Sequence, residues 1–200
     1  KNAKVFVEAK TAIHTFIRTL ESFEFSVSRL NALILSFFRR FAQLLRERFA
    51  SDFQQAIREA QHQPMIVNDA TELAKVLSVC WLKPGEAEQL GKQPFPLSLP
   101  FSQTYPLCCM DIRSLVEQYY SFSQGMTQYH QEIDAILSQS LDDLLIHLIS
   151  ANIRDTVEQS NNLSQIAQII VNIEHFQLAC SELEKWLSES STPNPGSQLV

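Results

Sequence analysis

Histidine, cysteine and acidic residues are the side chains of this 200-residue chain that could do chemistry. Histidine binds metals and moves protons, but a site needs several such groups at a spacing that brings them together. The five histidines are scattered without metal-ligand spacing, at positions 14, 62, 130, 147 and 175. His147 lies in the apolar run "LLIHLIS", where we expect a packed or interface-lining histidine. The histidine pattern predicts neither a metal site nor a cofactor.

The four cysteines, Cys80, Cys108, Cys109 and Cys180, do not form a CxxC motif. The adjacent pair Cys108 and Cys109 is badly placed for an ordinary disulfide. Free and mostly buried thiols in a reducing compartment are therefore the expected state. Cysteine usage predicts a cytoplasmic protein.

No common catalytic or nucleotide-binding motif occurs in the chain. The patterns GxxxxGK[ST], GxGxxG, HExxH and GxSxG are all missing from the sequence. Asp142 and Asp143 are a pair of acids, but neighbours on a helix point about 100° apart and do not act together by themselves. The sequence predicts a protein that is not an enzyme and has no small-molecule substrate.

The formal net charge of −6 disfavours nonspecific nucleic-acid binding, which depends on neutralising phosphates with Lys and Arg. A local exception is the segment "RRFAQLLRERF", which begins with Arg39 and Arg40. One interpretation is a solvated helix face beside a core face. The other is a contact to acidic lipid or to an acidic partner through Arg39 and Arg40.

Helical periodicity dominates the rest of the sequence. Apolar stripes predict helices over residues 2–20, 27–61, 69–82, 107–129, 131–158 and 163–187. The second of these would hold about 33 residues and measure about 50 Å at 1.5 Å per residue, which suits a rod or a large bundle. Strand patterns are nearly absent. We predict an all-α fold, an elongated helical bundle.

The segment 93–106 interrupts this pattern with Pro94, Pro96, Pro100 and Pro106. Proline fixes φ and biases the preceding residue toward extended backbone, so an extended strap is predicted here. Pro106 suits the first turn of a following helix. The predicted organisation is a first bundle over 1–92, the strap, a second bundle over 107–188 and a disordered tail over 189–200. Because the chain begins with Lys1 and ends in a polar tail, we expect a fragment of a longer polypeptide.

The predicted helix 163–187 has more apolar residues than one core-facing stripe needs, and Asn172 lies between Val171 and Ile173. One explanation is a helix that packs on two sides. The alternative is a partner-binding groove with Asn172 as its polar anchor.

Three segments resemble one family, in the right order: "FEFSVSRLNALILSFFRRFAQLLRERFASDF", "KQPFPLSLPFSQTYP" and "LSQIAQIIVNIEHFQLACSELEKWL". The chain is similar to the carboxy-terminal region of the exocyst subunit of the Sec-fifteen type. The strap with its flanking spacing is the more specific part of this likeness, because amphipathic helices occur in many families.

The resemblance implies a subunit of an eight-protein tether in exocytosis, built from rod-like helical bundles. It implies other exocyst subunits and a Rab-family GTPase in its GTP form as partners, at secretory vesicles and the plasma membrane. The positions that match the family's Rab contact are Gln168, Val171, Asn172 and His175. The alternatives are a subunit of another helical tethering complex without Rab binding, and a helical module that binds membrane surfaces.

Overall fold

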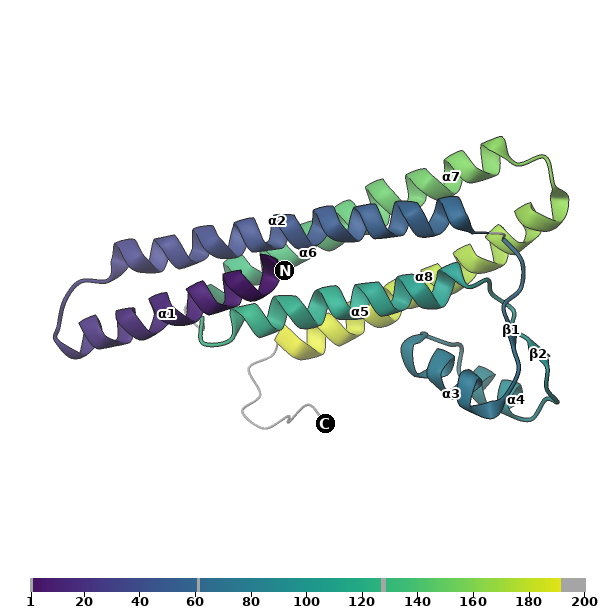
Figure 1. Cartoon of the computed structure of the whole chain (residues 1–200), viewed down its shortest axis with the longest axis horizontal. Coiled ribbons are helices and arrows are strands. Elements are labelled where there is room, and N and C mark those ends of the chain that lie inside the picture. The colour runs from purple at the N-terminus through teal and green to yellow at the C-terminus, as the bar shows by residue number, and fades with distance from the viewer. Residues whose placement is uncertain (1, 61, 127–128, 192–200) are drawn as a thin grey trace. The chain divides into compact units, whose positions relative to one another are not determined.

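The computed structural model describes residues 2–60, 62–126 and 129–191, and nearly all of them are helical (Figure 1). The helices are α1 (Asn2–Ser22), α2 (Ser28–Glu59), α3 (Ala70–Val79), α4 (Glu86–Gly91), α5 (Thr104–Ser123), α6 (His130–Asp142), a π-helical segment (Asp143–Ile149), α7 (Ser150–Gln159) and α8 (Leu163–Ser191). Strands β1 (Ile66–Val67) and β2 (Leu97–Ser98) form a small antiparallel sheet. The all-α fold class predicted from the sequence is confirmed.

The long helices follow the predicted stripes, except that α5 ends at Ser123 whereas the predicted helix runs to residue 129, and two further local features differ from the prediction. Helix α4 lies between the predicted helices 69–82 and 107–129, where the sequence predicts no helix. Gly85 begins it with a left-handed φ of 80°, which glycine adopts without strain, and the side chain of Glu86 accepts a hydrogen bond from Lys83 N at 2.9 Å. In addition, the predicted helix 131–158 contains the π-helical segment between α6 and α7.

The extended strap predicted for residues 93–106 is not confirmed as such. Within it the structure has the two-residue strand β2, and α5 begins at Thr104. Pro106 therefore lies inside the first turn of α5, where its missing N–H removes no helical hydrogen bond. The apolar side chains of the segment are mostly buried: Leu97, Leu99, Phe101 and Tyr105.

The chain divides into two compact units, each assembled from two separate stretches of sequence. The first unit holds residues 1–54 and 114–151, and the second holds 55–113 and 152–200, so α2, α5 and α7 contribute to both. The sequence predicted one bundle over 1–92 and another over 107–188, and this organisation stays a prediction. The predicted tail 189–200 falls mostly outside the described residues, and its first three residues continue α8.

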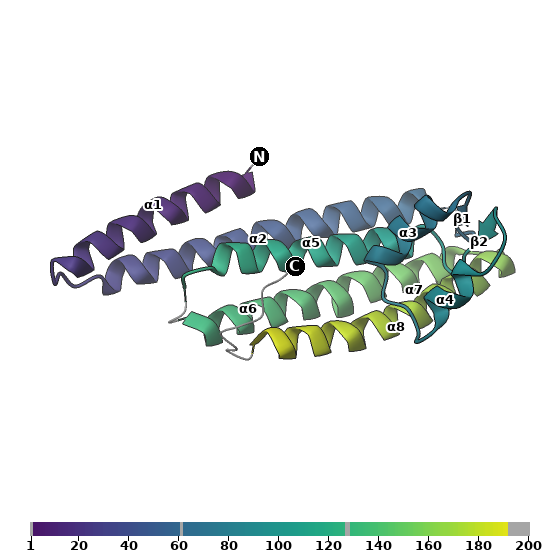
Figure 2. The same cartoon turned by 90° about the horizontal axis from the view of Figure 1, so that it is seen from below.

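The first unit is organised around aromatic side chains. Helix α1 and the beginning of α2 form an antiparallel hairpin (Figure 2). Phe41 of α2 stacks on Phe122 of α5 with ring centroids 4.5 Å apart, and Phe38 meets Tyr119 edge to face at 5.4 Å. All four rings are at most 2% exposed, so their burial is a main source of stability for this unit.

Polar side chains of α1 satisfy the carboxyl end of α5. The ammonium of Lys10 donates to Gln124 O, and a ring nitrogen of His14 lies 3.3 Å from Gly125 O. These carbonyls follow the last turn of α5, where helices have no internal donors left. Lys10 is only 8% exposed, and this burial lowers its pKa. Helix α1 is therefore joined to the unit by polar contacts as well as by apolar ones.

Tyr119 gives the first unit an alkaline sensitivity that a single substitution should remove. Burial raises the pKa of Tyr119 to about 12, although its hydroxyl hydrogen-bonds Ser140 Oγ at 2.7 Å. In the unfolded chain the tyrosine pKa is near 10. The folded state therefore holds the proton more tightly, and the stability from this group is complete below pH 10 and lost as pH rises toward 12. We expect a loss of about 2–3 kcal/mol over that window.

This prediction is checked by urea denaturation at several pH values from 9 to 12. Tyr119→Phe should flatten the decline in the free energy of unfolding, even if its stability at pH 8 is lower because the hydrogen bond is lost. Tyr129→Phe, at a half-buried tyrosine, is the matched control and should keep the wild-type decline. Parallel curves for wild type and Tyr119→Phe would contradict the assignment.

Candidate functional site

The predicted partner-binding residues lie on α8 in the second unit, and three of the four share one buried face. Gln168, Asn172 and His175 are spaced i, i+4 and i+7, which places them on the same side of the helix. Their exposures are 7%, 5% and 2%, whereas Val171 is half-buried. The structure therefore brings three of the candidates together, and it places them against another segment of the chain.

That segment is the stretch between β2 and α5. Asn172 Oδ1 accepts a hydrogen bond from Ser102 N at 3.0 Å, and Asn172 Nδ2 donates to Ser102 Oγ at 2.7 Å. Gln168 Nε2 donates to Pro100 O at 2.9 Å. Leu99 N and Phe101 O of this segment pair with Met65, and the two amide side chains satisfy the backbone groups of Pro100 and Ser102. Buried backbone groups of this kind require such partners. We call Gln168, Asn172, Pro100 and Ser102 the amide lock.

His175 extends this arrangement toward α4. Its Nδ1 donates to Val171 O at 2.8 Å, and its Nε2 lies 3.2 Å from Glu86 Oε1. A carbonyl and a carboxylate oxygen both accept hydrogen bonds, so each ring nitrogen faces an acceptor. Its ring lies edge-on to Phe101 and Tyr105, with centroids 5.2 and 5.3 Å away. The face of α8 that carries the amide lock is therefore fixed by packing as well as by hydrogen bonds.

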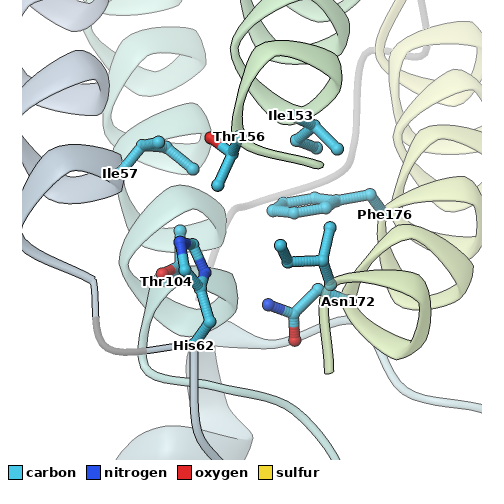
Figure 3. A pocket seen from close by; sticks show the side chains of 8 residues that line it. Ile57, His62, Thr104, Ile153, Thr156, Asn172 and Phe176 are labelled. Atoms are coloured by element: carbon cyan, nitrogen blue, oxygen red, sulfur yellow. The ribbon is translucent and has the colours of Figure 1, made fainter. Parts of the chain in front are cut away.

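A small pocket lies beside the amide lock (Figure 3). Its volume is about 10 Å³, which is at the lower limit for one water molecule. Figure 3 shows His62 and Thr104 on one side of it and Asn172 and Phe176 on the other. His62 Nδ1 is buried and has no hydrogen-bond partner among the described residues, and burial lowers the His62 pKa. The pocket is too small for a cofactor. It has room for at most one water molecule between these polar groups.

The cysteines all lie in the second unit, as free thiols. A hydrogen bond with Cys109, together with burial, raises the pKa of Cys80, and burial raises those of Cys108 and Cys180. The hydrogen bond with Cys80 lowers the pKa of Cys109. Within residues 2–60, 62–126 and 129–191, no group of three or more His, Cys, Asp or Glu side chains is placed to hold a metal ion.

The other residues that the sequence singled out lie wholly or partly exposed to solvent. Arg39 and Arg40 are exposed on α2, so the lipid contact suggested for them stays a prediction. Asp143 pairs with Arg46 of α2. His147 is exposed on the π-helical segment, so it is not a packed histidine, and the alternative that it lines an interface stays a prediction. Its apolar neighbours in sequence suggested burial, but Ile146 beside it is also 59% exposed.

Sequence reasoning missed the groups that hold the α8 residues in place. Ser102 and Glu86 are 70 and 89 positions away from their partners on α8, and no periodic pattern marks them. Tyr105 lies within the range of the predicted strap and is buried, and its hydroxyl donates to Trp81 O at 2.5 Å. The prolines close to Ser102 could have pointed to this arrangement. Proline has no N–H, so backbone groups near it lack regular hydrogen-bond partners.

Among the residues that the structure describes, no helix is both long and apolar enough to cross a membrane. No solved structure matches the chain.

Comparison of the sequence with known families and proteins gives one consistent result. Residues 29–199 match the family described as "Exocyst complex subunit Sec15 C-terminal". The chain is 27% identical to "Exocyst complex component SEC15" of Saccharomyces cerevisiae over 205 residues, covering 100% of this chain and 22% of that protein. It is 28% identical to "Exocyst complex component 6" of Rattus norvegicus over 183 residues, covering 91% of this chain and 22% of that protein.

The chain thus spans about a fifth of the length of the curated relatives that it matches. The family match covers α2 from its second residue and every element after it, including the segment of the amide lock and the whole of α8. The predicted resemblance is therefore confirmed, and the chain belongs to the family of exocyst complex subunit Sec15 C-terminal regions.

Proposed function

We propose that this chain is the part of an exocyst subunit that binds sister subunits and a GTP-loaded Rab-family GTPase, and that it thereby helps to link secretory vesicles to the plasma membrane. It acts in the cytoplasm, at vesicles and sites of exocytosis. The observation that carries the proposal is the arrangement of α8, which is fixed on one face by the amide lock and presents apolar side chains on the other. Leu163 is 82% exposed and Ile170 is 52% exposed.

The family supports a scaffolding role. Exocyst subunits are structural components of a tethering complex and not enzymes, so family membership confirms the prediction that the protein is not an enzyme. Binding sites in such a protein are surfaces, and exposed apolar side chains on an ordered helix are typical of them. Helix α8 has this character at Leu163, Ala167 and Ile170, which follow one another at helical spacing.

The four proposed Rab-contact residues differ in burial, which indicates different roles. Gln168, Asn172 and His175 are buried, so in this conformation they position α8 and the segment before α5. Val171 is half-buried and lies next to Ile170, so it belongs to the surface that a partner reaches. Selectivity for the GTP form follows if the partner presents this surface only with ordered switch loops.

The test is a pull-down of the purified chain against a panel of Rab proteins loaded with GTP analogue or GDP. We expect binding of at least one Rab in its GTP form, and Ile170→Asp should weaken that binding about tenfold or more, since buried apolar anchors dominate interfaces. The matched control is Gln177→Asp, which adds the same charge at an exposed position of α8.

Equal binding to the GTP and GDP forms would contradict the effector role. If both variants lost binding, the added charge and not the loss of an apolar contact would explain the effect. Binding of sister subunits without any Rab would leave the chain as an assembly module of the complex.

A further inference from the structure

A larger cleft opens beside the small pocket and shares His62 and Thr104 with it. Its volume is about 600 Å³, which is in the range of ligand-binding clefts. The end of α2, the segment leading into β1, one residue of α3 and the beginning of α5 contribute to its walls. Ser102 of the amide lock also lines it. The cleft therefore lies within the second unit, next to a rigidly held piece of backbone.

One wall of the cleft is the open edge of β1. Leu99 N donates to Met65 O at 2.7 Å, and Val67 lies opposite Leu97. Because the hydrogen-bonding groups of an antiparallel strand alternate in direction, Ile66 between them points its N–H and C=O away from β2. No hydrogen bond from these two groups to another described residue is present. Ile66 lines the cleft and its side chain is 60% exposed, so the edge is accessible for strand pairing.

The charge in the cleft has one sign. Glu59 and Glu72 line it, and no Lys or Arg is among its lining residues. Burial lowers the pKa of His62, so this side chain does not offset the carboxylates near pH 7. One carboxylate oxygen of Glu72 accepts a hydrogen bond from Asn68 N, which holds the group in place. The cleft therefore offers fixed negative charge beside the apolar side chains of Ile66 and Leu107.

We propose that this cleft binds an extended, positively charged segment of a partner protein by strand addition to β1. The backbone of the segment pairs with Ile66, and its Lys or Arg side chains meet Glu59 and Glu72. Strand addition derives affinity from main-chain hydrogen bonds and specificity from alternate side chains, which suits an edge with apolar and acidic groups beside it. The site uses none of the exposed residues of α8 and so goes beyond the proposed Rab contact.

The test uses a blocked hexapeptide of alternating Lys and Val, titrated into the 200-residue chain and followed by amide NMR shifts. We expect the shifts to concentrate at residues 59–72 and 102–107. A Glu–Val peptide of the same length should bind about tenfold more weakly or not at all. N-methylation of alternate amides in the Lys–Val peptide, which blocks strand pairing, should also abolish most of the binding.

A pair of charge variants tests whether the peptide binds at this cleft. Glu59 is exposed and its side chain contacts only Gln55 in the hydrogen bonds of the described residues, so Glu59→Lys should leave the fold unchanged. It should weaken the Lys–Val peptide about three- to tenfold. Glu88→Lys changes the same charge on α4, outside the cleft, and should have little effect.

Each alternative result has a definite meaning. Equal binding of the Lys–Val and Glu–Val peptides, equal effects of the two variants, or shifts outside the cleft would overturn the proposal. Undiminished binding of the N-methylated peptide would overturn strand addition as its mode.

Discussion

Asn172→Ala is expected to lower the free energy of unfolding by about 2–4 kcal/mol, because it removes both hydrogen bonds to Ser102 at once. Ser102 is 3% exposed, so its N–H would stay buried without an acceptor. A buried donor without a partner is more destabilising than the average hydrogen bond is stabilising. Urea denaturation followed by circular dichroism measures the effect. Helicity in the absence of urea should be retained, because the substitution favours helix at that position.

The same variant connects the amide lock to the proposed function. If the lock positions α8, Asn172→Ala should also weaken pull-down of the GTP-loaded Rab at temperatures where the chain is still folded. Gln177→Ala is the matched control, because it removes an exposed amide from the same helix. Stability within about 0.5 kcal/mol of wild type, the range of ordinary surface substitutions, would show that the lock contributes nothing to the fold.

Phe101→Ala should have the larger effect on stability, about 3–5 kcal/mol. Phe101 is 0% exposed and its ring lies 5.1 Å from Tyr105 and 5.2 Å from His175. Removing it leaves a cavity where the segment before α5 meets α8, and the backbone held by Gln168 and Asn172 limits how far that cavity can collapse. Thermal and urea denaturation measure the loss.

Phe95→Ala serves as the matched control within the same proline-containing segment. Phe95 is 37% exposed, so its truncation should lower stability by less than about 1 kcal/mol. Similar losses for the two variants would mean that the segment is held by its overall contacts and not by Phe101. A loss below about 1 kcal/mol for Phe101→Ala would contradict the packing described for α8.

The helices could be predicted from the sequence because their apolar stripes are long and uninterrupted. Helix α2 has no Gly or Pro between Ser28 and Glu59, and the predicted range 27–61 exceeds it by one residue at one end and two at the other. Helix α4 could not be predicted, since six residues are too few to show a period, and the turn before it depends on the left-handed Gly85 and on the hydrogen bond from Lys83 N to Glu86. The π-helical segment 143–149 was equally hidden, because its sequence continues the stripe of α6.

The candidate site was predictable as a set of positions on one helix but not as a surface. The spacing of Gln168, Asn172 and His175 shows that they share a face, yet it does not say whether that face meets solvent or protein. Their partners come from the segment before α5, nearly 70 residues earlier, and from α4. Long-range pairing of this kind leaves no periodic trace, so the sequence could not show that Gln168, Asn172 and His175 also hold other parts of the chain, and their contact with a Rab stays a proposal.

The hydrogen bonds from α1 to the end of α5 have a consequence for the design of truncated recombinant versions. A recombinant version that starts after residue 22 would lack the ammonium and the imidazole that meet the carbonyls of Gln124 and Gly125. It would also uncover the aromatic side chains of α2 that pack against Phe6. Shortened versions should therefore keep the amino-terminal helix as an integral part of the bundle.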